Sequence, residues 1–507
     1  MSALSTQTVI AVVGTGAMGA GIAQVAAAAG HTVKLLDNRP GAAEKAVAGI
    51  RAQFEKMAAK GKLTATDAKA AGERLIPVEQ LADLADAGLI TEAIVENLDA
   101  KQALYRDLEA IVGPDCIFGT NTSSISVTAI GAALKHPERL AGLHFFNPAP
   151  LMALVEIVSG LATDKAVAET LFASAAAWGK TPVHAKSTPG FIVNRVARPY
   201  YAEALRLAQE GAADYATIDA CCREAGGFRM GPFELMDMIG HDVNFAVTNS
   251  VWRAFYNDQR FLPSLLQQEL VDAGFFGKKT RRGFYDYREG AVKPEAQTEA
   301  AQTPVGKIVL IGESTATEAL ADRLQHCGLS FSRAADSDGR IAEIGRATIY
   351  VTDGRSATQR ACESGVANTV LIDLALDYDK ATRLALSTAQ QCEDLAASAA
   401  IGLLQAAGFA VSRFADVPGL AVMRTVAMLA NEAADAVNQG VCDAKAADAA
   451  MRLGVNYPCG PLAWADAVGL PVIRDVLANL SRTYGEDRYR ISPLIQQCVF
   501  AGKKIHD

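Results

Sequence analysis

The 507-residue chain lacks the cysteine patterns that mark disulfide scaffolds and zinc sites. Its nine cysteines are an odd number, and they include no CxxC pair and no histidine–cysteine cluster at zinc-ligand spacing. We therefore expect reduced thiols and no metal site. Cys221 and Cys222, which are adjacent, are interpreted as small core residues.

The chain also lacks targeting, membrane and polyanion-binding signals. No lysine or arginine precedes Lys34, so the N-terminus has neither the basic region of a secretory signal nor the arginines of a transit peptide. Glycines interrupt its one long apolar run, and no other run has the length to span a bilayer. The formal net charge of −8 argues against general nucleic-acid binding. We expect a soluble, cytoplasmic protein without membrane or nucleic-acid partners.

A complete βαβ pattern is present in residues 8–37, which form a strand, a glycine turn, a helix and a second strand. Gly14 permits the tight turn, Gly16 lets backbone amides approach a pyrophosphate, and Gly19 allows the helix to pack closely on the strand. The helix N-terminus then faces the phosphates. Ala17 and Met18 lie inside the same motif. The pattern predicts a dinucleotide site.

Asp37 ends the second strand, about twenty residues after the glycines. A carboxylate there accepts hydrogen bonds from the adenosine ribose and repels a 2′-phosphate, so NAD is the expected cofactor rather than NADP. Arg39, two residues later, is expected to soften that discrimination.

His144 and Glu156 stand in apolar strand patterns between Ala141 and Val158. A buried carboxylate is costly unless it is paired, and His144 is the nearest candidate partner. An imidazole held by a carboxylate through one nitrogen has a fixed tautomer and a free second nitrogen, as a general base requires. A purely structural ion pair is the alternative.

The chain is predicted to contain two α/β regions, each followed by helices, so its fold class is α/β with additional all-helical domains. The length and the 50% apolar content suit several domains. The expected boundaries are 1–185 for a Rossmann-type NAD-binding domain, 186–287 for a helical domain, 288–304 for a polar linker, 305–412 for a degenerate Rossmann-like domain and 413–507 for a second helical domain. The turn Gly312–Thr317 of the degenerate domain lacks the phosphate-binding glycines, so it should not bind NAD.

An internal repeat links the two helical regions. PGFIVNR at 189–195 matches PGLAVMR at 418–424, and the offset of 229 residues persists without a gap to Gly240 and Gly469. One register maintained over that length indicates a duplicated domain. The second copy has Met423 where the first has Asn194, and it ends before any equivalent of Lys279.

These motifs together resemble the L-3-hydroxyacyl-CoA dehydrogenase family. The resemblance covers residues 8–287 and rests on the glycine turn, NTSS at 121–124, HFFNP at 144–148, Glu156, PGFIVN at 189–194 and GKKTRRGFYDY at 277–287. The added second half makes the chain similar to the longer bacterial members, which oxidise 3-hydroxyadipyl-CoA in phenylacetate catabolism. The resemblance implies NAD-dependent oxidation of an (S)-3-hydroxyacyl-CoA to the 3-oxoacyl-CoA.

The resemblance also implies roles for individual residues. His144 takes the proton of the 3-hydroxyl and Glu156 orients it, while Ser123 and Asn194 bind the reacting oxygen and the thioester region. Glu96, Lys101, Asn147 and Lys279 match positions that line the NAD site, and Lys60 matches one near the CoA phosphates. The family uses its helical domain for dimerisation, so the second helical copy is expected to form an internal pseudo-dimer with the first. A homo-oligomer of the whole chain is a further possibility.

Other functions are weighed against this one. Ser123, His144 and Glu156 also suit a hydrolase triad, but there is no GxSxG elbow and the dinucleotide motif would lack a purpose. A non-catalytic NAD-binding regulator would keep the glycines without the His, Glu, Ser and Asn set. The β-hydroxyacid dehydrogenases with a catalytic lysine do not explain the His and Glu pair. Within the family, a short-chain 3-hydroxybutyryl-CoA dehydrogenase is the alternative to a 3-hydroxyadipyl-CoA dehydrogenase.

Overall fold

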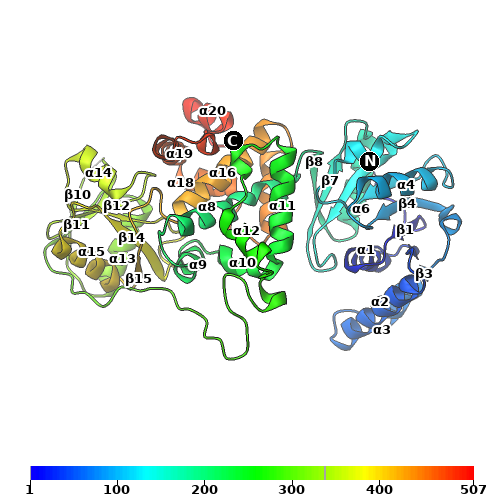
Figure 1. The fold of residues 1–507 in the computed structure, drawn as a ribbon, viewed down its shortest axis with the longest axis horizontal. Helices are drawn as coiled ribbons and strands as arrows, with labels where there is room; N and C mark the ends of the chain where they lie inside the picture. Colours follow the sequence, from blue (N-terminus) through cyan, green and yellow to red (C-terminus); the bar gives the residue numbers. More distant parts are fainter. Residues whose placement is uncertain (1, 336–337) are drawn as a thin grey trace. The chain divides into compact units, whose positions relative to one another are not determined.

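The computed structural model describes residues 2–335 and 338–507, and these residues form two compact units (Figure 1). The first unit comprises Met1–Arg195 and Gln439–Val455, and the second comprises Val196–Asn438 and Asn456–Asp507. A short segment of the second helical copy therefore belongs to the unit that contains the predicted NAD-binding domain. The five domain boundaries predicted from the sequence remain a prediction.

The first unit is built on an eight-stranded sheet with the order β3-β2-β1-β4-β5-β6-β7-β8. All neighbouring strands are parallel except β6 and β7. The strands are β1 (Val9–Val13), β2 (Val33–Leu36), β3 (Leu75–Pro77), β4 (Ala87–Glu92), β5 (Ile117–Thr120), β6 (Leu140–Phe145), β7 (Leu154–Ser159) and β8 (Thr181–Lys186). Most of them are apolar and buried on both faces, as parallel strands covered by helices must be.

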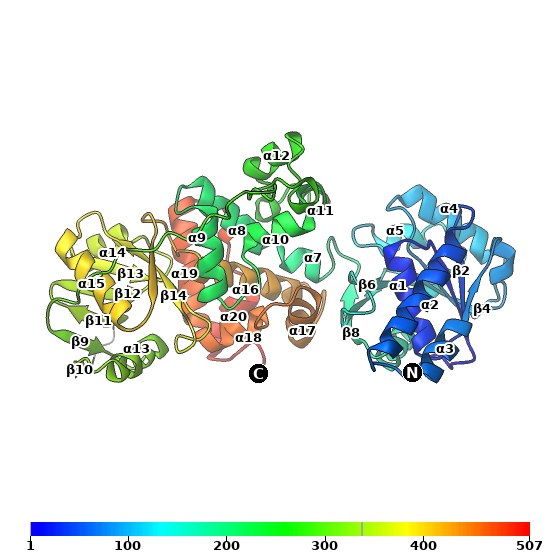
Figure 2. The same ribbon diagram turned by 90° about the horizontal axis from the view of Figure 1, so that it is seen from below.

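The chain leaves β1 in one direction to form β2 and β3, and it returns on the other side of β1 to form β4. The connections that follow β1 and β4 therefore leave the sheet in opposite directions and form a crevice at its carboxyl edge, which is where open parallel sheets bind ligands. The helices are α1 (Ala17–Ala28), α2 (Ala42–Ala59), α3 (Ala65–Glu73), α4 (Leu98–Glu109), α5 (Val127–Gly131), α6 (Lys165–Ala177) and α17 (Ala444–Gly454), and Figure 2 shows α1 and α2 beside this sheet.

The second unit holds the predicted shortened α/β region, with a seven-stranded sheet of order β10-β9-β11-β12-β13-β14-β15. Its strands are β9 (Ile308–Ile311), β10 (Ser332–Ala334), β11 (Arg340–Ile344), β12 (Ala347–Val351), β13 (Thr369–Ile372), β14 (Arg383–Thr388) and β15 (Ala410–Arg413). The helices α13 (Thr315–His326), α14 (Ala357–Ser364) and α15 (Asp394–Ala406) pack on it. This sheet confirms the second α/β region that the sequence predicts.

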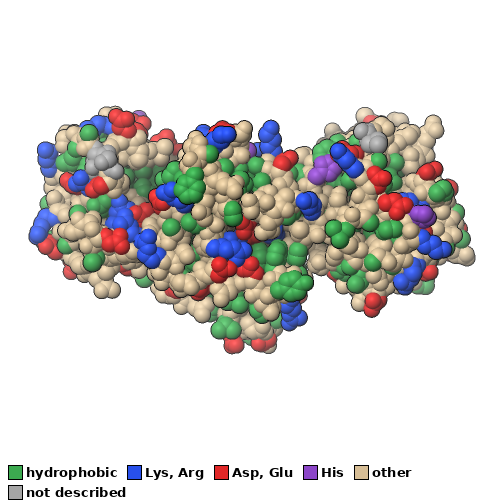
Figure 3. All heavy atoms as spheres, turned by 90° about the horizontal axis from the view of Figure 1, so that it is seen from above, with side chains coloured by type: hydrophobic (Ala, Val, Ile, Leu, Met, Phe, Trp, Pro, Cys, Tyr) green, Lys and Arg blue, Asp and Glu red, His purple; other side chains and the backbone are tan. Residues whose placement is uncertain are grey.

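The remaining helices of the second unit come from both helical copies, and α8 of the first packs against α16 of the second. They are α8 (Arg198–Gln209), α9 (Tyr215–Glu224), α10 (Pro232–Ile239), α11 (His241–Ala254), α12 (Leu265–Asp272), α16 (Val422–Asn438), α18 (Pro461–Val468), α19 (Leu470–Tyr484) and α20 (Pro493–Ala501); α7 (Val193–Val196) spans the boundary between the units. Basic and acidic side chains are interspersed on the face drawn in Figure 3. Within the described residues, no helix combines the length and the apolar character needed to span a membrane.

The backbone confirms the internal repeat. Helices α9, α10 and α11 begin at residues 215, 232 and 241, and α17, α18 and α19 begin 229 residues later, at 444, 461 and 470. The left-handed turn before each helical copy is also repeated, since Phe191 has φ 47° and Leu420 has φ 52°. Such a conformation is uncommon for residues with a side chain, so its repetition shows that the two copies fold alike.

The same offset extends back into the two sheets, which sequence comparison alone did not reveal. Strands β6, β7 and β8 begin at 140, 154 and 181, and β13, β14 and β15 begin at 369, 383 and 410. By this register Asp373 takes the position of His144, and Ala385 takes that of Glu156. The second copy has therefore lost both members of the predicted His–Glu pair.

Asp373 has a structural role in the second copy. Its carboxylate accepts the backbone N–H groups of Ala421, Val422 and Met423 at 2.9, 2.7 and 2.9 Å, at the beginning of α16. The side chain is fully buried, and this burial raises the pKa of Asp373 to about 6 although the hydrogen bonds lower it. A helix N-terminus favours a negative charge, which explains why a buried acid is tolerated there.

We expect Asp373→Asn to change how stability depends on pH. In the wild type the folded state takes up the Asp373 proton near pH 6, whereas the unfolded state takes it up only near the ordinary value of 3.8. The stability of the wild type relative to the variant should therefore rise, by up to about 1.4 kcal/mol per pH unit, as the pH falls through this window. Urea unfolding of both proteins at several pH values measures the difference, and parallel pH profiles would contradict the assignment.

Candidate active site

The glycine turn after β1 has the geometry expected of a phosphate-binding loop. Gly14 has φ 91°, and a Cβ atom there would lie 2.7 Å from the Ala93 carbonyl oxygen. A Cβ atom on Gly19 would lie 1.8 Å from the Gly14 carbonyl oxygen, so α1 packs directly on the turn. Gly16 faces open space, and no side chain caps the first amides of α1. These unused N–H groups are the donors that a pyrophosphate needs.

Asp37 follows β2 and turns toward this loop. Its Oδ2 accepts hydrogen bonds from the backbone N–H and the hydroxyl of Thr15, both at 2.8 Å. Arg39 donates from Nε to Oδ1 of Asp37 at 2.9 Å, and this contact holds the pKa of Asp37 well below its usual value. Arg39 thus pairs with Asp37, and its effect on the choice between NAD and NADP remains a prediction. A cavity of about 620 Å³ lies here, lined by both residues together with Gly14, Ile94 and Leu104 among others.

A buried charge network follows β4 and supports the other side of the crevice. The Lys101 ammonium is 1% exposed and lies 2.8 Å from Oε2 of Glu92 and 3.3 Å from Oε2 of Glu96. Burial raises the pKa of Glu96, but hydrogen bonds from the Thr122 and Ser124 hydroxyls and the charge of Lys101 outweigh it and leave the pKa low. Lys101 therefore neutralises two carboxylates at the end of β4.

Glu96 also positions the turn that carries Ser123. The backbone N–H groups of Ser123 and Ser124 donate to Glu96 Oε1 at 3.0 and 3.1 Å. The Ser123 hydroxyl makes no hydrogen bond to any described residue. Ser123 is therefore held by its backbone, and its hydroxyl remains available to a ligand.

His144 and Glu156 lie opposite each other on the antiparallel strands β6 and β7. His144 Nδ1 lies 2.6 Å from Glu156 Oε2, and the two residues are 4% and 0% exposed. With a proton on Nδ1, the imidazole donates to the carboxylate and leaves Nε2 as an acceptor. Nε2 has no partner among the described residues, so the arrangement suits a general base.

The second oxygen of Glu156 is bound by the start of the helical region. Glu156 Oε1 accepts the N–H groups of Ile192 at 3.1 Å and Val193 at 3.0 Å. Asn194 is the next residue and is half-buried. The carboxylate therefore links the histidine to the helix start that carries the predicted amide, and it keeps both in place.

Helix α17, from the second helical copy, packs on β7 and β8 beside this pair. A Cβ atom on Gly454, at the end of α17, would lie 2.7 Å from Leu154 Cδ2, 3.0 Å from Val193 Cγ2 and 3.7 Å from Phe146 Cε1. Val193 binds Glu156, and the Phe146 ring lies 4.6 Å from the His144 ring, centroid to centroid. The second copy therefore touches the immediate surroundings of the His–Glu pair.

A larger cavity of about 1110 Å³ lies over α1 and α2. Its wall includes Asn147 and five basic side chains: Arg39, Lys45, Lys56, Lys60 and Lys62. Exposed lysines around an open cavity suit an anionic ligand with several phosphates. The predicted Lys60 and Asn147 thus share one cavity.

Lys279 belongs to the second unit, whereas the other predicted site residues belong to the first. It lies in the turn 278–280, where its ammonium pairs with Asp242 and lies 5.6 Å from the centre of the Phe276 ring. Its role toward NAD remains a prediction.

Glu92 is a residue of this site that was not predicted from the sequence. The available signal was an acid at the end of the buried strand AGLITE, of the same kind that singled out Glu156.

Comparison with known families covers nearly the whole chain. Residues 9–188 match the 3-hydroxyacyl-CoA dehydrogenase NAD binding domain, and residues 190–287 and 419–505 both match the C-terminal domain of that family. Residues 349–418 match the 3-hydroxybutyryl-CoA dehydrogenase reduced Rossmann-fold domain. The double match to one domain confirms the internal repeat.

Individual relatives are named for the same family. The chain is 46% identical to 3-hydroxyadipyl-CoA dehydrogenase of Escherichia coli K12, over 97% of this chain and 98% of that protein. A probable 3-hydroxybutyryl-CoA dehydrogenase of Bacillus subtilis is 40% identical over 55% of this chain and 97% of its own length. A crystal structure titled 3-hydroxybutyryl-CoA dehydrogenase, from E. coli K12, is 45% identical, with a TM-score of 0.89 and coverage of 98% and 99%. The chain belongs to the 3-hydroxyacyl-CoA dehydrogenase family and is an NAD-dependent enzyme that oxidises 3-hydroxyacyl-CoA thioesters.

Proposed function

We propose that the enzyme oxidises (S)-3-hydroxyadipyl-CoA, in phenylacetate catabolism. The observation that carries this proposal is the full-length agreement with the E. coli protein of that name, including the second α/β region and the second helical copy. The Bacillus subtilis relative named for 3-hydroxybutyryl-CoA covers only 55% of the chain. The crystal structure of a full-length relative is titled for 3-hydroxybutyryl-CoA, so the short-chain substrate is the competing proposal.

In the proposed reaction, His144 Nε2 accepts the proton of the C3 hydroxyl. NAD, when bound, accepts the hydride that leaves C3 of the substrate. Glu156 keeps the Nδ1 proton directed toward itself and stabilises the imidazolium that forms. Loss of the hydroxyl proton and of the C3 hydride would leave a carbonyl at C3.

The remaining predicted residues receive supporting roles in this proposal. The uncapped helix start after Gly16 and the Asp37 carboxylate suit the pyrophosphate and the adenosine ribose of NAD. Ser123 and Asn194 bind the substrate oxygens, and Lys60 faces the CoA phosphates. The proposed NAD contacts also include Ala17, Met18, Gly14, Gly19, Glu96, Lys101, Asn147 and Lys279.

The second α/β region is proposed to bind no NAD. Ser314 caps the N-terminus of its helix α13, since the Ser314 hydroxyl accepts the Thr317 N–H at 3.2 Å. The side chain thereby satisfies an amide that is left unused in α1, and so removes a donor that a phosphate would need. Separately, we propose that the protein is located in the cytoplasm.

We also propose that the two halves form an internal pseudo-dimer. In the first unit, the Lys186 N–H donates to the Val441 carbonyl oxygen at 2.9 Å. In the second unit, the residues with the same offset of 229 make the matching bond, from Ala415 to Ala212, at 2.9 Å. Each helical copy therefore contacts the α/β region of the other half, which is the pattern of a fused dimer that exchanges segments.

The substrate proposal is tested by steady-state rates of NADH formation with 3-hydroxyadipyl-, 3-hydroxyhexanoyl- and 3-hydroxybutyryl-CoA. We expect the highest kcat/KM with 3-hydroxyadipyl-CoA, by at least about tenfold, since a bound carboxylate contributes about as much as one charged hydrogen bond. A higher kcat/KM with 3-hydroxybutyryl-CoA would assign the enzyme to the short-chain substrate instead.

The contact of α17 with the neighbours of the His–Glu pair gives a second test. Because the Cβ atom of Gly454→Ala would press on Leu154 and Val193, we expect kcat to fall by roughly tenfold while the KM for NAD stays unchanged. Shortening the neighbour in Gly454→Ala/Leu154→Val should recover most of the rate.

The matched control for this test is Gly113→Ala, since Gly113 is exposed and no atom lies within 4 Å of the added Cβ. It should keep the wild-type rate. If Gly454→Ala were as active as the wild type and also more stable, as alanine normally makes a helix, the packing of α17 would have no part in catalysis.

A further inference from the structure

Strand β6 extends beyond the end of its parallel neighbour β5. The last pair of their ladder is Thr120 with Gly142, whereas β6 continues to Phe145. Residues 143–145 pair with β7 on one side, but on the other side the β5 ladder has ended. Phe145 is 2% exposed. A buried backbone N–H at such a place needs another acceptor, because an amide without one is costly.

Asn121 supplies this acceptor. Its side-chain oxygen, Oδ1, accepts the Phe145 N–H at 2.8 Å. Its own backbone N–H donates to the Glu92 carbonyl oxygen at 3.0 Å, so its main chain continues the ladder between β4 and β5. Asn121 therefore connects the residue after His144 to the rest of the sheet at the point where the pairing of β5 and β6 ends.

The second copy provides an internal comparison, because its strands β12 and β13 correspond to β5 and β6. Their ladder continues for one pair beyond the equivalent of Thr120 with Gly142, and this additional pair is Val351 with Ile372. Val351 therefore takes the position of Asn121, and an apolar side chain suffices where the ladder continues. The copy that has lost the His–Glu pair has also lost this asparagine.

The equivalent backbone amide is bound in the second copy as well, but by a different group. Leu374, which corresponds to Phe145, donates its N–H to Asp373 Oδ1 at 2.8 Å. Asp373 takes the position of His144, so the side chain at this position binds the amide itself. In the first copy the imidazole is bound to the carboxylate opposite it. Asn121 therefore takes over the contact and leaves the imidazole to its own partners.

Asn121 also begins the turn that carries Ser123. Glu96 holds this turn through the backbone N–H of Ser123, at 3.0 Å, and Asn121 holds it to β6. Ser123 and His144 are both proposed to contact the C3 oxygen of the substrate, so the distance between their side chains must fit one oxygen atom. Small errors in such a distance cost much of the rate.

We propose that Asn121 is a positioning residue of the reaction, which holds the end of β6 through the Phe145 N–H and thereby keeps His144 in place relative to Ser123. The inference rests on the proposed role of His144 as the general base. The glycine turn that suits the NAD pyrophosphate lies elsewhere in the sheet. Loss of the contact should therefore lower kcat and leave the affinity for NAD unchanged.

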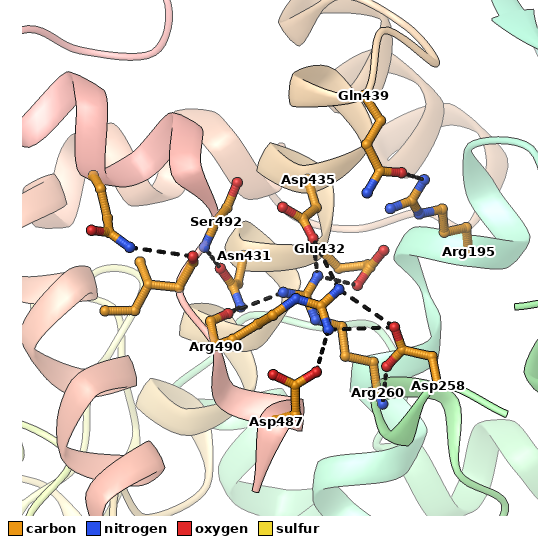
Figure 4. Close-up of polar contacts among 12 residues, drawn as sticks. Arg195, Asp258, Arg260, Asn431, Glu432, Asp435, Gln439, Asp487, Arg490 and Ser492 are labelled. Carbon is orange, nitrogen blue, oxygen red and sulfur yellow. Dashed lines mark hydrogen bonds and ion pairs between the residues drawn. The ribbon is translucent and has the colours of Figure 1, made fainter. Parts of the chain in front are cut away.

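An asparagine bound to backbone groups can also serve stability alone. Asn431 of α16 is an example in the second unit, since it accepts the Ser492 N–H and donates to the Arg490 carbonyl oxygen, both at 2.8 Å (Figure 4). Asn121 differs because the amide that it binds belongs to the residue next to His144. The test must therefore separate a loss of rate from a loss of folded protein.

The experiment measures kcat of the full-length enzyme per NADH-binding site, with the number of sites taken from a fluorescence titration. We expect Asn121→Leu, which has a similar size and no acceptor, to lower kcat by roughly tenfold and to change the KM for NAD by less than about twofold. Asn121→Asp keeps an oxygen acceptor and should stay within about threefold of the wild-type kcat. If Asn121→Leu yields no NADH-binding protein, Asn121→Ser takes its place with the same expectation.

Asn368→Leu is the matched control, because it makes the same substitution in the second α/β region. Asn368 Oδ1 accepts the Glu393 N–H at 2.9 Å, and the residue is 8% exposed. Its loss should lower the melting temperature and leave kcat per NADH-binding site unchanged.

A double variant shows whether Asn121 acts through His144. In the His144→Gln background, the additional change Asn121→Leu should lower kcat by less than about twofold, since the base that it positions is already absent. A further loss of about tenfold in that background would overturn the proposal, as would an Asn121→Asp variant as slow as Asn121→Leu. If His144→Gln alone kept the wild-type rate, the proposed base would be wrong, whereas additive losses would overturn only the role of Asn121.

Discussion

The structure of the site depends on one buried carboxylate, that of Glu156. It has no exposure to solvent, and each of its oxygens is bound by different groups. One oxygen faces His144 Nδ1 and the other accepts two backbone amides at the start of α7. A buried charge with fewer partners would be costly, so the same interactions that stabilise the carboxylate also fix His144, the proposed base, and the helix that carries Asn194. The proposed geometry of catalysis and the stability of this strand thus have one origin.

The second copy shows what remains when the chemistry is removed. Its helix start is still bound by a carboxylate, but this belongs to Asp373, at the position equivalent to His144. An acid at that point satisfies the amides and leaves no base, and Ala385 takes the place of Glu156. The second copy therefore still has a carboxylate that binds the first amides of its helix, but it has no equivalent of His144, the proposed proton acceptor. Its helix α17 instead packs on β7 and β8 of the first unit, beside the His144–Glu156 pair.

Much of this site could be predicted from the sequence, because the signals are local. The glycines require particular backbone angles and close approaches, and a histidine and a glutamate in apolar strands require a partner. The contact of Gly454 with Leu154 and Val193 could not be predicted, since it joins residues that are far apart in the chain and leaves no periodic pattern. The pairing of Arg39 with Asp37, the buried Lys101–Glu92 ion pair and the replacement of His144 by Asp373 likewise depend on strand register and side-chain direction. The glycine turn and the His144–Glu156 pair could be recognised from short sequence segments. The contacts of Gly454, Arg39 and Lys101 become visible only in the folded structure.

The central claim is that His144, held by Glu156, is the general base, and His144→Gln tests it most directly. The variant should be compared with the wild type in kcat for 3-hydroxyacyl-CoA oxidation and in NADH affinity measured by fluorescence. The account predicts that kcat falls by at least about a hundredfold, since general-base catalysis contributes that much, whereas NADH binds with nearly unchanged affinity. A variant that kept more than about a tenth of the wild-type kcat would contradict the assignment of His144 as the base.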